Sequence, residues 1–114
     1  MGNSGKYDMI LVDEASQTLE PSVLIPLCRG GESVKHVILV GDHKQLGPVI
    51  STSSKDYKDF MQKSLMERLC ENKITPIMLK QQRRMHSLIS SFSNYAFYNN
   101  EIVDATDDNI LTPL

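Results

Sequence analysis

The sequence has little cysteine and no long apolar run, and both absences narrow the kind of protein it can encode. Its two cysteines, Cys28 and Cys70, lie far apart and outside any C-x-x-C motif. We expect two buried, reduced thiols in an intracellular protein, with a disulfide as the alternative. No apolar stretch approaches the roughly 18 to 20 residues of a membrane-spanning helix, and the N-terminus lacks the plan of a signal peptide. We therefore expect no membrane role.

An excess of positive charge is also absent. The 114 residues carry a formal net charge of −2, so composition gives no sign of a nucleic-acid binder. A groove between two domains needs only local positive charge, so the net charge of the chain does not exclude nucleic-acid binding either. A hydrophobic fraction of 40% and a charged fraction of 23% are typical of a soluble globular chain with room for one core.

The phosphate-binding loop of the P-loop NTPases, GxxxxGK[ST], is missing as well. Residues 2–6 read GNSGK, but the spacing is wrong, Tyr7 follows the lysine, and an expected strand follows the segment instead of preceding it. We interpret residues 1–6 as a remnant of expression or a flexible start. Because a P-loop supplies most of the phosphate binding, these residues alone are predicted to be inactive and part of a larger machine.

Strand and helix patterns alternate along the chain, which predicts an α/β fold with a parallel sheet. Apolar runs predict strands over residues 9–12, 36–40 and 76–79, and apolar periodicity predicts helices over 19–28, 60–71 and 86–98. The last helix carries Ile89, Phe92 and Ala96 on one side. We expect Pro26 to kink the first helix or divide it into two pieces, and the Gly30-Gly31 pair to end it.

Two of the predicted strands end in polar residues. Asp13 and Glu14 follow the first strand, and Gly41, Asp42 and Gln45 follow the second. The carboxyl ends of parallel strands meet at one edge of a sheet, where ligands bind. There an aspartate can hold magnesium through water, a glutamate can activate the attacking water, and an amide can sense phosphate. Each segment alone could be a solvated loop, but together they favour a nucleoside triphosphatase site.

A third polar segment follows the third predicted strand and contains the adjacent arginines Arg83 and Arg84. An arginine reaching in from a second lobe can clamp phosphoryl oxygens and raise transfer rates by about 10³ to 10⁵. A solvated basic pair at a helix start is the alternative for this segment taken alone.

Four collinear blocks, DEASQ, VGDHKQLGPV, KSLMERL and LKQQRRMH, complete the pattern. In these blocks, from about Tyr7 to Ile102, the sequence resembles the superfamily I helicases of the up-frameshift (regulator of nonsense transcripts) group, which includes senataxin and the immunoglobulin mu-binding helicase. The resemblance implies a RecA-like P-loop NTPase in which two lobes bind ATP and magnesium between them. Residues 7–80 would then form the C-terminal half of lobe one, and residues 81–114 the start of lobe two.

The resemblance also implies a function and a set of partners. The whole protein would be an ATP-dependent helicase that moves 5′ to 3′ along single-stranded RNA or DNA, serving RNA surveillance such as nonsense-mediated decay. Its partners would be the nucleic acid, ATP, and the P-loop portion and remaining second lobe of the parent protein. We expect a cytoplasmic location, with a nuclear one left open. A non-catalytic interaction module, a DNA helicase of the same superfamily, and a P-loop ATPase that is not a helicase remain as alternatives.

The resemblance assigns roles to residues by motif position. In the first two blocks Asp13 would hold magnesium, Glu14 would activate water, and Gln45 would contact the γ-phosphate on a loop shaped by Gly41 and Asp42.

In the fourth block Arg84 would reach the γ-phosphate, while Gln82 and Arg83 would belong to the nucleotide site. Most relatives have tyrosine at Arg83 and proline at Ser87. A guanidinium plane can also stack on a base, so Arg83 would retain nucleotide binding with altered strength or base selectivity.

Overall fold

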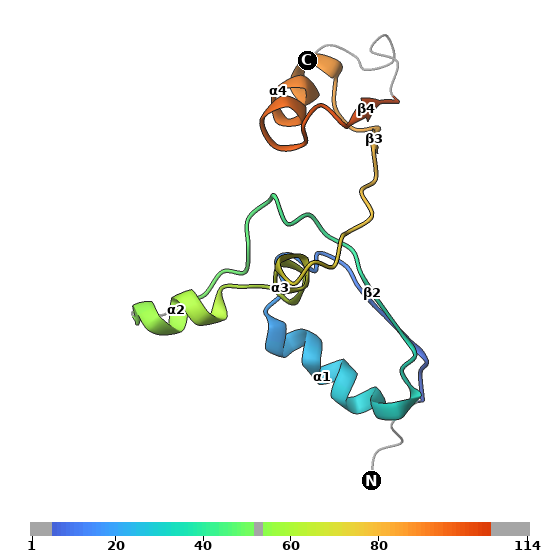
Figure 1. The fold of residues 1–114 in the computed structure, drawn as a ribbon, viewed down its shortest axis with the longest axis vertical. Coiled ribbons are helices and arrows are strands. Elements are labelled where there is room, and N and C mark those ends of the chain that lie inside the picture. Colours follow the sequence, from blue (N-terminus) through green and yellow to red (C-terminus); the bar gives the residue numbers. More distant parts are fainter. Residues whose placement is uncertain (1–5, 52–53, 106–114) are drawn as a thin grey trace. The chain divides into compact units, whose positions relative to one another are not determined.

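The computed structural model describes residues 6–51 and 54–105, drawn as the coloured ribbon in Figure 1. The chain divides into two compact units, Met1–Thr75 and Pro76–Leu114. Each unit is a small α/β arrangement with its own pair of parallel strands. The predicted class is therefore confirmed, and each unit is described separately below.

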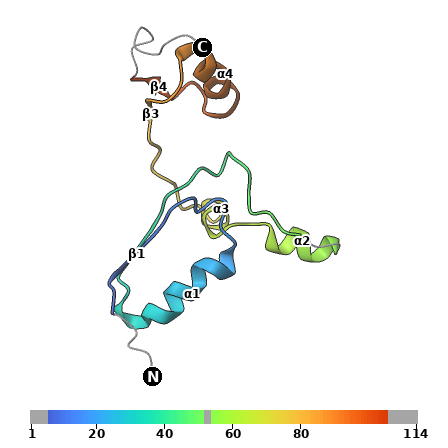
Figure 2. The ribbon, with the colours of Figure 1, turned by 180° about the vertical axis from the view of Figure 1, so that it is seen from behind.

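A parallel two-stranded sheet organises the first unit. Strand β1 (Met9–Val12) pairs with β2 (His36–Leu39), with Met9 opposite His36 and Val12 opposite Leu39. The two strands run side by side in both ribbon views (Figures 1 and 2). Helix α1 (Glu20–Gly30) and a short 3-10 turn, η1 (Gly31–Ser33), connect them. Both strands lie where the sequence predicts them.

Helix α1 begins one residue and ends two residues later than the helix predicted over 19–28. Pro21 occupies its first turn, and it ends at Gly31, whose φ of 50° lies in the left-handed region that glycine tolerates best. The helix runs unbroken through Pro26, so the expectation of two pieces is wrong. The carbonyl of Pro26 accepts a 2.5 Å hydrogen bond from the Tyr7 hydroxyl, which ties the helix to the segment before β1.

The predicted helix over residues 60–71 is two helices, α2 (Lys55–Met61) and α3 (Leu65–Glu71). The break has a local cause. Ser64 is extended, pairs with Leu19 in an isolated antiparallel bridge, and accepts a hydrogen bond from the Glu67 amide 3.1 Å away. A serine followed three residues later by glutamate is a helix-start signal. The apolar periodicity hides this signal, because Met61 and Leu65 continue the same stripe.

The core of the first unit is small. Its buried apolar side chains are Ile10, Ala15, Val23, Pro48, Leu65 and Met66. Cys28 is exposed and Cys70 is half-buried, and both are free thiols. The thiols are unpaired, as predicted, but the prediction that they are buried is wrong. Cys28 lies on α1, where only Val23 is buried, and Cys70 lies near the end of α3, where only Leu65 and Met66 are buried.

The second unit is held together by a shorter parallel pair. Strand β3 (Gln81–Gln82) pairs with β4 (Val103–Asp104), and helix α4 (Ser87–Phe97) connects them. The strand predicted at residues 76–79 is wrong: within the described part of the chain this segment pairs with no strand and is exposed. A strand needs a hydrogen-bonding neighbour, and β4 offers its edge to Gln81 and Gln82 instead.

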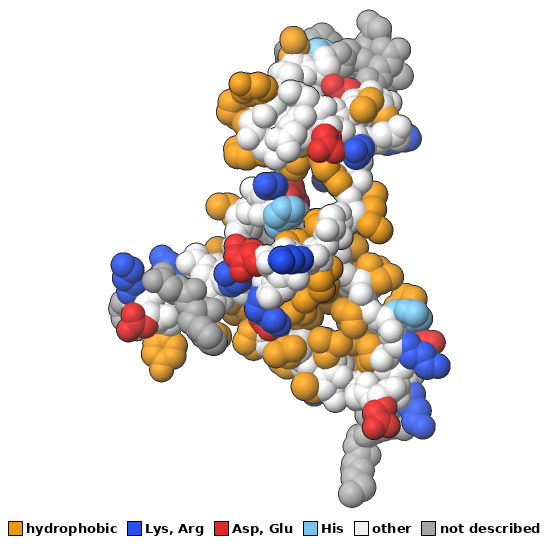
Figure 3. Space-filling model, viewed as in Figure 1, with side chains coloured by type: hydrophobic (Ala, Val, Ile, Leu, Met, Phe, Trp, Pro, Cys, Tyr) orange, Lys and Arg blue, Asp and Glu red, His pale blue; other side chains and the backbone are white. Residues whose placement is uncertain are grey.

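Helix α4 agrees with the predicted helix to within one residue at each end. His86 caps it through a 3.2 Å hydrogen bond from the Leu88 amide to its Nδ1 atom. The predicted apolar face is largely uncovered, with Ile89 61% and Phe92 72% exposed. Apolar side chains also gather on the surface in the space-filling view (Figure 3). No helix in the described ranges is long and apolar enough to cross a membrane.

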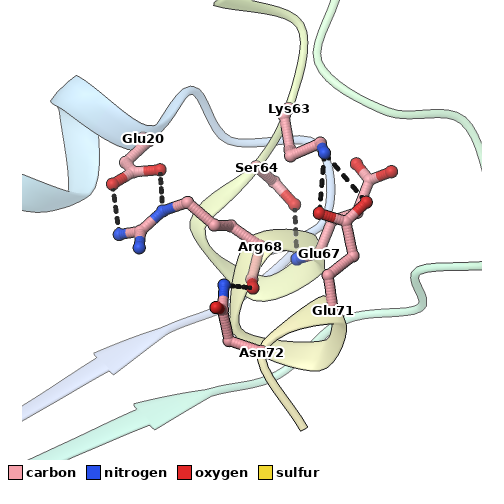
Figure 4. Close-up of polar contacts among 7 residues, drawn as sticks. All are labelled: Glu20, Lys63, Ser64, Glu67, Arg68, Glu71 and Asn72. Atoms are coloured by element: carbon pink, nitrogen blue, oxygen red, sulfur yellow. Dashed lines mark hydrogen bonds and ion pairs between the residues drawn. The ribbon is translucent and has the colours of Figure 1, made fainter. Parts of the chain in front are cut away.

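An ion pair joins α1 to α3 in the first unit. Arg68 donates from Nε and Nη2 to the two carboxylate oxygens of Glu20 at 2.8 and 2.5 Å, the forked geometry drawn in Figure 4. Beside it, Lys63 binds Glu71 at 2.7 Å. The hydrogen bonds from Arg68 hold the pKa of Glu20 below its ordinary value, and they raise the pKa of Arg68. The pair therefore favours the charged forms of both groups.

This ion pair predicts a pH-dependent contribution to stability. Because the pKa of Glu20 is lowered by folding, the stabilisation is present above its unfolded pKa and is lost as the pH falls through the lowered folded pKa. In the intact protein, Glu20→Gln should lower the unfolding midpoint by at most a few degrees at pH 7 and by nothing once the pH is well below 4.5. Thermal unfolding of both proteins between pH 7 and pH 3 measures this difference, and a pH-independent difference would contradict it.

Candidate active site

The loops that follow β1 and β2 are bonded to each other at one edge of the sheet. The Ala15 amide donates to the Val40 carbonyl at 2.8 Å, and the Val40 amide donates to the Val12 carbonyl at the same distance. Further along the two loops, the Asp42 amide donates to the hydroxyl of Ser16 at 3.3 Å. The acidic segment and the Gly-Asp segment therefore lie next to each other, as the sequence predicts.

Gly41 permits this close approach. A Cβ atom at this position would lie 2.9 Å from the Ser16 amide nitrogen and 3.0 Å from that of Ala15. It would also lie 3.3 Å from the sulfur of Met66 on α3. Two of these neighbours are backbone atoms, which cannot give way without moving the acidic loop. The glycine is thus needed for the contact between the loops.

Glu14 has an unusual backbone conformation. Its φ of 50° places a non-glycine residue in the left-handed region, a strain that persists only where the surroundings impose it. The Asp13 carboxylate accepts from the Glu14 amide at 3.0 Å, and the Glu14 carbonyl accepts from the Gln17 amide at 2.9 Å and the Thr18 hydroxyl at 3.1 Å. These bonds hold the turn and leave both carboxylates exposed at the sheet edge.

Asp42 organises the second loop. Its carboxylate accepts from the Lys44 amide and from the Gln45 side-chain amide, both at 3.0 Å, and its carbonyl accepts from the Gln45 backbone amide at 3.1 Å. Gln45 is exposed, and its side-chain nitrogen is held by Asp42. The loop therefore has a fixed shape, as predicted from Gly41 and Asp42, and its glutamine lies beside the acidic segment.

A polar hollow of about 230 Å³ lies next to this edge. It is lined by Ser16, His43, Gln45, Gly47, Gln62, Ser64 and Glu67. Sequence reasoning missed Ser16, Ser64 and Glu67 as neighbours of the site. Ser16 is 2% and Ser64 is 1% exposed. The helix-start pattern at Ser64 could have located α3, but only the folded chain shows that α3 borders the loop containing Gln45.

The carboxylates at this edge suit a magnesium ion that is held mainly by water and substrate phosphates. Among the described residues no group of three or more His, Cys, Asp or Glu side chains is placed to hold a metal. Magnesium is usually held by one or two carboxylates, with water and substrate phosphates completing its octahedron. The exposed carboxylate of Asp13 suits such a site, and Glu14 follows it directly.

The arginine segment lies in the second unit and is built around Gln82. The Gln82 side-chain oxygen accepts from the Arg84 and Met85 amides, both at 2.9 Å, and its nitrogen donates to the Met85 carbonyl at 2.8 Å and to the Asp104 carboxylate. Arg83 and Arg84 are exposed. Arg83 and Arg84 thus share one loop fixed by Gln82, whose own amide is fully bonded in this structure.

Comparison with known proteins finds two family matches along the chain, and the second of them begins in the first unit and extends through the second. Residues 1–53 match one family described as "AAA domain", and residues 61–112 match a second family with the same description. The Regulator of nonsense transcripts 1 homolog of Neurospora crassa is 46% identical over 97 residues, which are 85% of this chain and 8% of that protein. The ATP-dependent helicase NAM7 of Saccharomyces cerevisiae is 42% identical over 97 residues, 85% of this chain and 10% of the relative.

A third relative, the 5'-3' DNA helicase ZGRF1 of Mus musculus, is 34% identical over 112 residues, 98% of this chain and 6% of that protein. This chain belongs to the AAA-domain helicase family. Membership implies a P-loop NTPase fold and confirms the resemblance inferred from the four sequence blocks. The chain spans a tenth or less of the length of each of these helicases.

The close approach at Gly41 yields a prediction with an internal control. In the intact protein, Gly41→Ala should destabilise the fold by about 1 to 3 kcal/mol, because the new methyl group meets backbone atoms. Gly47→Ala should cost little, since its Cβ would lie 3.5 Å from its nearest neighbour, the Gln62 carbonyl, in ordinary contact. Chemical denaturation of both variants measures the difference. Equal stabilities would show that the two loops do not need this contact.

Proposed function

We propose that this chain is the segment of an ATP-dependent helicase that carries the magnesium-binding and water-activating carboxylates, Asp13 and Glu14, and the second-lobe arginine that reaches the γ-phosphate, Arg84. The observation that carries the proposal is the bonding of Ala15 and Ser16, directly after Asp13 and Glu14, to Val40 and Asp42 of the Gly-Asp loop. Residues 7–80 would form the C-terminal half of a RecA-like lobe one and residues 81–114 the start of lobe two. The P-loop would come from another part of the protein.

The residues of the first unit divide the hydrolysis between them. Asp13 would hold Mg²⁺, which neutralises phosphate charge when bound. Glu14 would accept a proton from the attacking water while the oxygen of that water bonds to the γ-phosphorus. The bond from the γ-phosphorus to the bridging oxygen would break, which releases ADP and phosphate. Gln45 would exchange its bond to Asp42 for one to the γ-phosphate, which would report the state of the nucleotide to its loop.

Two arginines of the second unit would complete the site. Arg84 would neutralise charge on the γ-phosphate, as an arginine supplied from a second lobe does. Arg83 would lie against the base, where its guanidinium plane can stack on adenine. Gln82 would stay close to the nucleotide through the loop that it shapes. The exposure of both arginines supports these roles.

The nucleic-acid substrate would be single-stranded and the direction of movement 5′ to 3′. RNA, and a cytoplasmic role in RNA surveillance such as nonsense-mediated decay, are favoured because relatives named as regulators of nonsense transcripts reach 46% identity. A DNA helicase is the second candidate, because the relative ZGRF1 is named as a 5'-3' DNA helicase and matches 98% of the chain.

Glu14→Gln tests the water-activating role. In the intact protein the change should lower ATP turnover by about 10²-fold or more, since it removes the base but keeps the shape of the side chain. Nucleotide binding should stay near that of the unaltered protein. Asp8→Asn, at the other end of β1, is the matched control, because only its backbone carbonyl is used, by the amides of Lys35 and His36. Turnover near the unaltered rate in Glu14→Gln would remove Glu14 from its role.

Arg84→Ala tests the phosphate contact of the second unit. Because the arginine acts on charge that builds up in the transition state, ATP turnover should fall by about 10³-fold or more while nucleotide affinity falls far less. Steady-state ATPase kinetics and equilibrium binding of a fluorescent nucleotide give the two quantities. Arg29→Ala, in the last turn of α1, controls for loss of a positive charge. Equal losses in turnover and binding would contradict the assignment.

A further inference from the structure

The side chain of Gln82 has no hydrogen-bonding capacity left for a ligand in this structure. Its oxygen accepts two backbone amides, those of Arg84 and Met85, and its nitrogen donates to the Met85 carbonyl and to Asp104. An amide offers two donors and two acceptor positions, so this set uses all four. A residue engaged in this way shapes its own loop instead of contacting a nucleotide.

The partner of Gln82 comes from a distant part of the sequence. Asp104 lies on β4, and its Oδ1 atom accepts from Gln82 and, at 2.7 Å, from the hydroxyl of Ser90 on α4. Ser90 is 3% exposed and is the buried residue of that helix. The same strand is bonded to β3 through the Ala105 amide, 3.0 Å from the Gln82 carbonyl. One carboxylate oxygen therefore joins the arginine loop to both β4 and α4.

The strand that supplies Asp104 is itself held in place. Asn94 of α4 donates to the Ile102 carbonyl at 2.7 Å and accepts from the Ile102 amide at 2.9 Å. The Val103 amide donates to the Lys80 carbonyl at 2.7 Å. Asp104 thus approaches Gln82 from a fixed position, and the loop is fixed from outside as well as from within.

We infer that Gln82 and Asp104 form a positioning pair that sets the backbone of Arg84 for its contact with the γ-phosphate. The inference rests on the proposed function and deepens it. The pair does not touch the nucleotide. It acts because the Arg84 amide is bonded to Gln82, and a displacement of about 1 Å at a catalytic group can cost about a hundredfold in rate.

The polarity of the pair can be broken and then restored. Gln82→Glu places a carboxylate opposite that of Asp104, so the two groups repel each other. Adding Asp104→Asn removes the like charge and lets the asparagine amide donate to the new glutamate, while the Ser90 hydroxyl keeps its bond to the Ser87 carbonyl. Asp104→Asn alone keeps the acceptor for Gln82 and should be nearly neutral. If Gln82 mattered only for the space that it fills, Gln82→Glu and the double variant would have the same ATP turnover.

The experiment measures ATP turnover in the intact protein for the two single variants and the double variant. We expect Gln82→Glu to lower kcat by about 10- to 100-fold with a smaller change in KM, and the double variant to recover about fivefold or more of that loss, since the bond to the Met85 carbonyl stays broken in both. Amide hydrogen exchange over residues 83–86 should rise in Gln82→Glu and fall back in the double variant. Glu101→Gln is the control, because it breaks the neighbouring Lys80–Glu101 ion pair without touching the arginine loop.

Equal turnover in Gln82→Glu and the unaltered protein, or no recovery in the double variant, would overturn the inference. If Gln82→Glu alone fails to fold, the double variant decides in the same way. Failure of the proposed function has a different signature: Arg84→Ala would then leave turnover unchanged. The exchange measurement does not depend on activity, so it tests the pairing of Gln82 with Asp104 in either case.

Discussion

The hydrogen bond from the Ala15 amide to the Val40 carbonyl is the contact on which the candidate site depends. It extends the pairing of β1 and β2 beyond the last residue of both strands, so the acidic loop and the Gly-Asp loop leave the sheet together. The bond is possible only because Gly41 lacks a Cβ where the two backbones meet. Ser16, buried beneath the junction, adds the bond to Asp42. This contact between the two loops fixes the positions of Asp13, Glu14 and Gln45.

Helix α3, which contains most of the KSLMERL block, packs beside the contact between the two loops. Ser64 starts the helix, Leu65 and Met66 are buried, Glu67 borders the hollow next to Gln45, and Arg68 binds Glu20 at the start of α1. The residues from Ser64 to Arg68 thus serve in turn to cap the helix, fill the core, line the hollow and bind α1. The block therefore holds α3 against α1 and against the loop that contains Gln45.

The second unit holds its polar loop in a different way. Its loop is ordered by side-chain hydrogen bonds that converge on Gln82, because its strands have only two residues each and supply few ladder bonds. The two units therefore present their polar groups in different ways, one through backbone contact at a sheet edge and one through an amide at the centre of a loop. Both units leave large apolar side chains exposed, such as Val49 in the first and Ile77 in the second.

The sequence by itself determined the strands β1 and β2, the approximate ends of α1 and α4, and the placement of the acids and the glutamine on one edge, because apolar runs mark the strands locally and a helix between two strands favours parallel pairing. It did not determine the break before α3, the irregular backbone at residues 76–79 or the exposure of Cys28, which depend on which partner lies alongside. Only the tertiary structure decided that Gln82 bonds to Asp104, 22 residues away, because no local pattern encodes a hydrogen bond between distant side chains.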